Sequence, residues 1–262
     1  YTNKPVSGAF RGYGVPQGTW ACEQHMDELA KRLSIDPLAF RKQNIFSEGE
    51  VSYWGEELES VGLEECLDRV AAALEAAAPR TDGVGRGLAC MIKPPTASTA
   101  SEAAVTLDSE GNVTVLAGTV EIGQGCNTIQ SQIAAEERDV PLERVTYAPL
   151  DTDVTPYDAS TTSSRSTYHV GNAVRMAAAN LREKLLEFAP LVVGTCAPAD
   201  LRLQDGTVWL ESEPERRCDA AEIVKAAAGS DGVLRGEGEC APGGIELDPE
   251  TGHSPQAAAY YM

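Results

Sequence analysis

The period of the hydrophobic pattern changes about a third of the way along the chain, and this change restricts the folds that the sequence can adopt. Before it, apolar residues recur at helical spacing, whereas after it short alternating runs lie between helical stretches. We predict helices over 16–33, 37–43, 62–78, 126–137, 170–188 and 219–228, and strands over 102–107, 113–116, 145–150, 201–203 and 208–210. The tail from Gly236 is expected to be irregular. Hairpins mixed with helices favour an α+β fold over a doubly wound parallel sheet.

A cluster of Pro, Arg, Thr, Asp and Gly residues between Pro79 and Gly87 marks the most plausible internal boundary. The 262 residues suit one or two domains of ordinary size. We therefore expect one domain over 1–80 and a second over 81–262. Because the chain begins at Tyr1 rather than Met, we also expect it to be a piece of a longer polypeptide or to be completed by a partner.

The net charge of −19 excludes some functions. Such an acidic chain repels phosphate backbones, so nucleic acids and anionic membranes are not expected as partners. The sequence has no apolar run long enough to predict a membrane span. Its seven cysteines form no C-x-x-C pair, which predicts reduced thiols in the cytoplasm and no metal cluster held by this chain alone.

Familiar catalytic signatures are absent from the sequence. It contains no G-x-S-x-G, no phosphate-binding G-x-x-x-x-G-K-S/T and no G-x-G-x-x-G motif. Of the three histidines, His25 falls within a predicted helix, and His169 adjoins a run of Ser and Thr residues. A structural role is expected for His25, and for His169 both a structural and a functional role stay open.

Three segments stand out because each is rich in glycine or hydroxyl residues and leads into a predicted helix. They are Gly8–Gln17, Glu121–Thr128 and Ser160–Thr167. The free N–H groups at the start of a helix attract anions. Arg11 and Arg165 add guanidinium donors, and Gln124 carries both a donor and an acceptor. Structural alternatives remain for each: a turn with a surface arginine, a loop that caps itself and a flexible linker.

Taken in order, these segments resemble the xanthine dehydrogenase and aldehyde oxidase family of molybdenum hydroxylases. The residues from Gly8 to Gln17 are similar to the family's A-F-R-G-F/Y-G-x-P-Q segment, and Gly118–Gly125 is similar to its second cofactor loop. Asp151–Pro156, followed by Thr161–Ser166 and Gly171–Val174, is similar to the third. The order and spacing agree from residue 1 to about residue 190, which makes the resemblance far more specific than any single loop.

The resemblance implies a molybdenum–molybdopterin cofactor, with its cytosine dinucleotide form as an alternative. It implies that Tyr13 contacts substrate and that Arg11 also lies against the oxygen and sulfur ligands of the metal. It further implies 2Fe–2S clusters and FAD on partner subunits or domains. The implied cofactor-binding residues are Phe10, Arg11, Gly12, Gly123, Gln124, Gly125, Ser163, Ser164, Arg165 and Ser166.

The sequence also departs from the family pattern. The family's first half is absent, and the glutamate that acts as base lies outside this chain, because the context of Glu239 matches an earlier family segment. The resemblance thus implies two-layer α/β sandwich subdomains: the C-terminal part of the first molybdopterin-binding subdomain and an incomplete second one. The implied activity is an oxidoreductase that hydroxylates an electron-poor C–H carbon of a heteroaromatic or aldehyde substrate, active with the missing half. A non-catalytic interaction subunit or fragment is the alternative.

Overall fold

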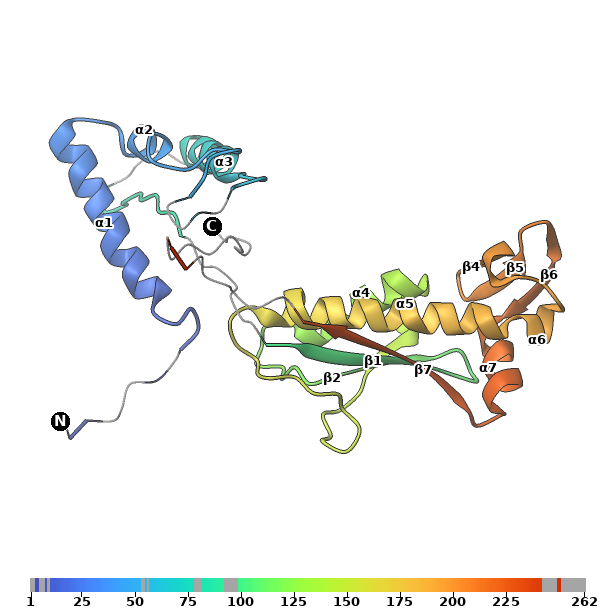
Figure 1. Cartoon of the computed structure of the whole chain (residues 1–262). Coiled ribbons are helices and arrows are strands. Elements are labelled where there is room, and N and C mark those ends of the chain that lie inside the picture. Colours follow the sequence, from blue (N-terminus) through green and yellow to red (C-terminus); the bar gives the residue numbers. More distant parts are fainter. Residues whose placement is uncertain are drawn as a thin grey trace. The chain divides into compact units, whose positions relative to one another are not determined.

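The computed structural model describes residues 3, 4, 8, 10–52, 55, 57–77, 82–91, 99–241, 249 and 250. These residues fall into two compact units. Unit 1 holds those within 1–96 and 245–262, and unit 2 holds those within 97–244. Figure 1 shows the elements of both units along the chain. No helix among the described residues is long and apolar enough to cross a membrane.

Unit 1 is helical in its described part. Its helices are α1 (Val15–Leu33), α2 (Pro37–Lys42) and α3 (Leu63–Ala76). Pro16 lies in the first turn of α1, where its missing N–H costs no hydrogen bond. The Asp36 carboxylate caps α2 by accepting hydrogen bonds from the backbone N–H groups of Leu38 and Ala39, both at 3.0 Å. These local signals explain why the predicted helix starts are confirmed.

Arg41 joins the elements of unit 1. Its buried guanidinium donates to Glu23 Oε2 and to Asp27 Oδ1 on α1, both at 2.8 Å. Glu23 Oε2 also accepts from the backbone N–H of Cys90 at 2.9 Å. Because one buried cation satisfies carboxylates on α1 from its place on α2, it fixes the angle between these helices.

Unit 2 contains the remaining helices and strands. The helical segments are α4 (Cys126–Arg138), η1 (Leu142–Arg144), the π-helix η2 (Ser166–Val170), α5 (Gly171–Phe188), α6 (Pro190–Val193), η3 (Pro198–Asp200) and α7 (Ala220–Ala228). The strands are β1 (Ser101–Asp108), β2 (Val113–Ala117), β3 (Val145–Tyr147), β4 (Leu201–Gln204), β5 (Thr207–Leu210), β6 (Glu213–Asp219) and β7 (Val233–Cys240). Helices and mixed sheets together confirm the α+β class.

The larger sheet has the order β3-β2-β1-β7. The β1–β2 hairpin turns at Asp108, whose Oδ1 accepts from the backbone N–H groups of Glu110 at 2.8 Å and Asn112 at 2.9 Å. Strand β3 pairs in parallel with β2 after the α4 crossover. In the centre of the sheet, Val105 stands opposite Val115 on one side and Gly236 on the other.

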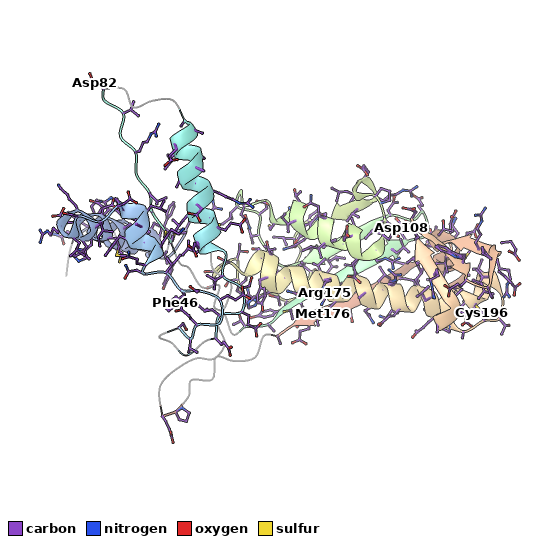
Figure 2. All side chains as sticks on the ribbon, turned by 90° about the horizontal axis from the view of Figure 1, so that it is seen from above. Phe46, Asp82, Asp108, Arg175, Met176 and Cys196 are labelled. Carbon is purple, nitrogen blue, oxygen red and sulfur yellow. The ribbon has the colours of Figure 1, made fainter. Side chains whose placement is uncertain are left out.

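Helix α5 packs so closely on β7 that only glycine fits at two strand positions. A Cβ atom on Gly236 would lie 2.2 Å from the carbonyl oxygen of Ala177, and one on Gly238 would lie 2.3 Å from that of Ala173. Figure 2 shows Arg175 and Met176 on α5, and both are exposed, whereas the positions on either side of them are buried. The core between sheet and helices contains Ala103, Val105, Leu107, Val113, Val115, Ala134, Val174, Ala177, Leu181 and Leu185.

One expectation about the second half is wrong in part. The sequence predicts an irregular tail from Gly236, but Gly236–Cys240 complete β7, because the glycines are needed for contact with α5 rather than for a turn. Most of the tail after residue 241 lies outside the described residues. Strand β6 is absent from the predicted elements, since its charged sequence and its proline resemble a loop. The predicted second hairpin is confirmed as β4–β5, which turns through Asp205 and Gly206, both with positive φ.

Candidate functional site

The first candidate segment is a tight turn that begins α1. Gly12 has a φ of +91°, and a Cβ atom there would lie 2.7 Å from the Pro16 ring, so the turn requires glycine. Phe10 is 86% exposed and Tyr13 is 78% exposed, so both present their rings to the outside of unit 1. Within the described part of the chain, the Arg11 side chain makes no hydrogen bond or ion pair and α1 has no side-chain cap. The Arg11 guanidinium is therefore available to an anion, whereas the start of α1 offers few free N–H groups, because Val15 N–H donates to the Gly12 carbonyl at 3.0 Å and Pro16 has none.

In the second candidate segment, backbone N–H groups already donate to the carboxylate of Glu121. Its Oε1 accepts from the backbone N–H groups of Gly123 at 2.7 Å and Gly125 at 3.0 Å. Its Oε2 accepts from the backbone N–H of Asn127 and the thiol of Cys126, both at about 3.4 Å. The hydrogen bonds from Gly125, Gly123 and Asn127 lower the pKa of Glu121 to about 2.

Gln124 also bonds within its own loop. Its Oε1 accepts from the backbone N–H of Ile122 at 2.7 Å, and its Nε2 donates to the Val120 carbonyl at 2.9 Å. A primary amide has two donor hydrogens and two acceptor lone pairs, so one of each stays available. This loop therefore offers a fixed backbone and one oriented amide, while the start of α4 already holds the carboxylate of Glu121.

The third candidate segment leads into one continuous helix formed by η2 and α5. Ser163 and Ser164 both take the left-handed conformation, with φ of 50° and 58°, immediately before the helix begins at Ser166. No side chain in the described structure caps this helix start. Successive N–H groups in such turns make concave sites for anions. A π-helical first turn is itself rare and is found mostly at functional sites.

Arg165 lies inside unit 2 rather than at its surface. The side chain is only 1% exposed, and Nη1 donates to Asp158 Oδ1 at 2.9 Å and to the Ser160 carbonyl at 2.7 Å. Nη2 donates to the Ala100 carbonyl at 2.9 Å and to Ser101 Oγ at 2.6 Å. Both Nη atoms are thus engaged inside the protein, and Nε, which has no partner among the described residues, is buried as well. This geometry favours an indirect role for Arg165, and direct contact with a cofactor stays a prediction.

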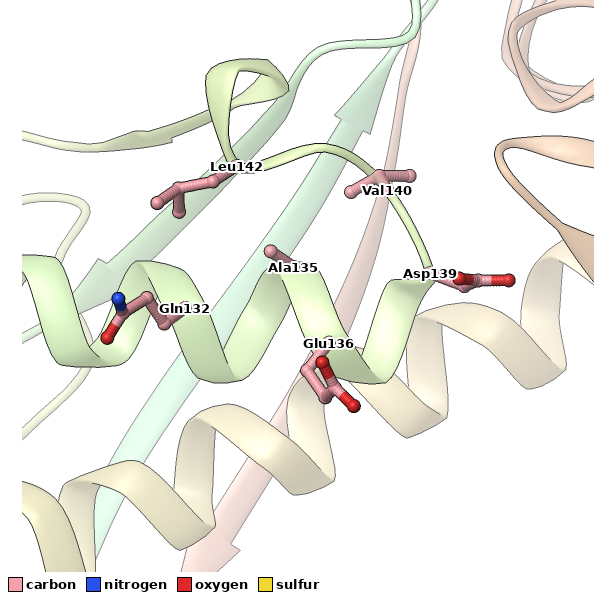
Figure 3. A pocket seen from close by; sticks show the side chains of 6 residues that line it. All are labelled: Gln132, Ala135, Glu136, Asp139, Val140 and Leu142. Atoms are coloured by element: carbon pink, nitrogen blue, oxygen red, sulfur yellow. The ribbon is translucent and has the colours of Figure 1, made fainter.

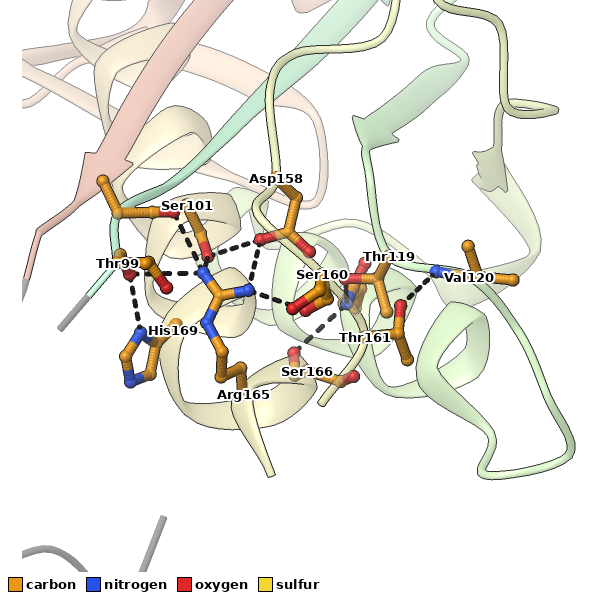
Figure 4. A network of polar contacts seen from close by, with 12 residues as sticks. Thr99, Ser101, Thr119, Val120, Asp158, Ser160, Thr161, Arg165, Ser166 and His169 are labelled. Atoms are coloured by element: carbon orange, nitrogen blue, oxygen red, sulfur yellow. Dashed lines mark hydrogen bonds and ion pairs between the residues drawn. The ribbon is translucent and has the colours of Figure 1, made fainter. Parts of the chain in front are cut away.

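The second and third segments lie next to each other in unit 2 (Figure 4). The backbone N–H of Val120 donates to Thr161 Oγ1 at 2.8 Å. The buried amide of Gln130 bridges them again, because Nε2 donates to Thr119 Oγ1 at 3.3 Å and to the Ser166 carbonyl at 3.2 Å. Phe10, Arg11, Gly12 and Tyr13 belong to unit 1.

Sequence patterns do not single out three residues that hold these loops in place: Glu121, Gln130 and Asp158. A signal existed for Glu121, since an acidic residue just before a helix start is suited to accept from its N–H groups. Gln130 and Asp158 act through contacts between distant segments, which local spacing does not reveal. His169 is also buried, with Nδ1 at 3.3 Å from the Thr99 carbonyl, and burial lowers its pKa, so a structural role fits it.

A surface hollow lies beside the C-terminal half of α4 (Figure 3). It is lined by Gln132, Ala135, Glu136, Asp139, Val140 and Leu142. Two carboxylates in the lining repel an anionic ligand, and the candidate loop that ends at Gly125 lies at the opposite end of α4. This hollow is therefore not part of the candidate site.

Two family models match this chain. One model of the molybdopterin cofactor-binding domain matches residues 58–262, and a second model with the same description matches residues 1–45. Together they include all three candidate segments.

Similar proteins extend well beyond this chain. This chain is 35% identical over 229 residues to the xanthine dehydrogenase molybdenum-binding subunit of Escherichia coli O157:H7. The aligned region covers 82% of this chain and 30% of that protein. This chain is also 30% identical over 247 residues to the nicotine 6-hydroxylase large subunit of Paenarthrobacter nicotinovorans, and this alignment covers 86% of this chain and 30% of that protein. The chain thus spans about 30% of the length of these relatives.

Solved structures share the fold. Quinoline 2-oxidoreductase from Pseudomonas putida 86 matches with a TM-score of 0.73 and 24% identity over 92% of this chain and 34% of that one. The aldehyde oxidoreductase of Desulfovibrio desulfuricans ATCC 27774 matches with a TM-score of 0.64 and 26% identity, over 95% of this chain and 25% of that one. The chain therefore belongs to the molybdopterin cofactor-binding domain family of the xanthine dehydrogenase and aldehyde oxidase type of molybdenum hydroxylases.

Proposed function

We propose that this chain is the molybdenum-cofactor-binding portion of an oxidoreductase that hydroxylates an electron-poor C–H carbon of a heteroaromatic or aldehyde substrate. The bound molybdenum–molybdopterin supplies the transfer of oxygen derived from water to that carbon. The nicotine, quinoline, xanthine and aldehyde in the names of the matched proteins support this substrate range. The cofactor-binding residues stay as expected, except that Arg165 acts from inside the fold.

The donor chemistry of the loops fits such a cofactor. The single observation that carries the proposal is the uncapped start of η2 after the left-handed turn at 163–164, where backbone N–H groups of the first helical turn can face an anion. Arg11 adds an exposed guanidinium with no partner in the described part of the chain. In a chain of net charge −19, these local donors are what attracts a phosphate-bearing group.

The second loop contributes shape and one amide. Because Glu121 neutralises the donors of Gly123 and Gly125, this loop does not bind the phosphate. The open acceptor and donor of Gln124 fit the mixed polar edge of a pterin instead. Phe10 and Gly12 lie against the metal ligands in this proposal, and the exposed ring of Tyr13 stacks on the substrate.

Other segments or partner subunits supply the rest of the machinery. Residues 1–80 complete a first molybdopterin-binding subdomain and residues 81–262 form most of the second. The glutamate base, the rest of the cofactor-binding half, the iron–sulfur clusters and FAD come from the missing part or from partner subunits. The 6-hydroxypseudooxynicotine dehydrogenase complex subunit gamma, 28% identical over 293 residues, is by name part of a complex, which supports this arrangement.

The proposal is tested by loss of metal in matched variants. We expect Arg11→Ala and Gln124→Ala to lower the molybdenum content of the purified protein by about ten-fold, as expected for groups that bind or orient a metal centre. Arg32→Ala, which removes an exposed arginine of the same unit, is the control and leaves the content unchanged. Tyr13→Ala keeps the molybdenum and lowers turnover. Equal molybdenum in Arg11→Ala, Gln124→Ala and the control contradicts the proposed site.

A further inference from the structure

A buried polar network connects the ends of segments that are far apart in sequence (Figure 4). We call it the Arg165 network; it comprises Thr99, Ala100, Ser101, Asp158, Ser160 and Arg165. Arg165 and Asp158 form an ion pair at 2.9 Å, and each side chain is 1% exposed. The Ser101 hydroxyl donates to the same oxygen of Asp158 at 2.8 Å. One cation therefore holds the start of β1 and the loop before η2 together.

The network reaches the second proposed cofactor loop as well. Gly118, at the start of that loop, lies so close to Asp158 that a Cβ atom on it would be 2.8 Å from the Asp158 Cβ. Beyond this contact, Val120 donates to Thr161, and Gln130 bridges Thr119 to the Ser166 carbonyl. A displacement of the loop at 158–166 is thus transmitted to the loop at 118–125 through direct contacts.

The chemistry of the site requires arginine. A planar guanidinium presents donors in a fixed fork, and here the fork is shared between a carboxylate, a hydroxyl and backbone carbonyls of two segments. A lysine keeps the charge but supplies a single ammonium centre, which cannot reach both groups of acceptors in the same geometry. Asp158 supplies the compensating negative charge, without which a buried cation is strongly unfavourable.

We propose that Arg165 is a positioning residue that couples the loops at 118–125 and 158–166, so that both present their backbone to the cofactor in one fixed arrangement. This inference rests on the proposed function. Arg165 itself touches neither metal nor pterin in this arrangement, because its Nη atoms are already bound within the protein.

Hydrogen exchange separates this coupling from a purely local structural role. In Arg165→Lys we expect faster amide exchange in peptides covering 118–125 as well as 158–166, with the β1–β7 ladder unchanged. The control is Arg216→Lys, which alters an arginine that also donates to backbone carbonyls, those of Val193 and Thr195, at the second sheet. It leaves exchange in both loops at the wild-type rate.

Cofactor retention gives the second measurement. We expect Arg165→Lys to release molybdenum about ten-fold faster than wild type and Arg216→Lys, which is the usual scale for residues that orient a metal site from outside. If Arg165→Lys does not fold, Ser101→Ala removes one acceptor of Nη2 and gives a smaller change in the same direction.

The outcomes are distinct. Faster exchange confined to 158–166, or wild-type exchange in both loops, overturns the coupling. Coupled exchange with unchanged molybdenum release overturns the link between the coupling and the cofactor. A wild-type protein without molybdenum, in which Arg165→Lys still loosens both loops, overturns the proposed function but leaves the coupling in place.

Discussion

The glycines of β7 give a prediction whose size follows from the structure. In Gly236→Ala the new Cβ would lie 2.2 Å from the Ala177 carbonyl oxygen and 2.5 Å from the Leu181 nitrogen, where ordinary contact begins at 3.4 Å. In Gly238→Ala the distances to the Ala173 carbonyl oxygen and the Ala177 nitrogen are 2.3 and 2.4 Å. The obstacles are backbone atoms of a long helix, which cannot rotate away as a side chain does.

The strand and α5 must therefore separate by about 1 Å across the core, and overpacking of this kind costs about 3 kcal/mol in the free energy of unfolding, the upper end of its usual range. For a body of this size, that loss lowers the midpoint of thermal unfolding by about 6 to 12 °C. Circular dichroism during heating and in urea measures both quantities. Gly18→Ala is the control, because its site in α1 is open and a helix favours alanine.

If both β7 variants unfold within about 1 kcal/mol of wild type, the close packing of α5 on β7 is wrong. The same experiment bears on the Gly-Glu-Gly-Glu stretch at 236–239. It resembles the surroundings of a catalytic glutamate, but its glycines are accounted for by their contact with α5.

Glu239→Gln leaves turnover unchanged in steady-state assays, because Glu239 is an exposed strand residue; a large loss of turnover contradicts this. Leu181→Ala lowers the free energy of unfolding in urea by about 2–5 kcal/mol, because the side chain is fully buried, and a loss under about 1 kcal/mol refutes that packing. Glu121→Gln loses the stability that the ionised carboxylate gives the folded protein. Because the folded pKa of Glu121 is lowered, this loss is constant above pH about 4.5 and shrinks as the pH falls toward about 2. Thermal unfolding midpoints of wild type and variant that differ equally at every pH contradict the role of the carboxylate.

Local patterns sufficed to predict most helices, both hairpins and the α+β class. The start of α2 is predictable because Asp36 and Pro37 are local signals, and the β4–β5 turn because Asp205-Gly206 favours positive φ. Strands β6 and β7 were not predictable by this route. Their residues are charged or glycine, and they form strands because of neighbours that are distant in sequence.

The candidate loops were located from glycine and hydroxyl patterns, but the roles within them depend on contacts that spacing does not encode. Glu121 turns a predicted anion site at α4 into one already filled by a carboxylate. Arg165 has the sequence position of a phosphate ligand, yet Asp158 and Ser101 draw it into the interior. Both reversals arise from tertiary contacts formed within one body, unit 2.

The central claim is that this chain holds the molybdenum cofactor. Its most direct test is to measure molybdenum by plasma mass spectrometry, and pterin by fluorescence after oxidation, in the wild-type protein purified with its assembly partners from a host that makes the cofactor. We expect stoichiometric amounts of both, lowered together in Arg11→Ala. A folded, intact assembly that contains neither molybdenum nor pterin contradicts the account.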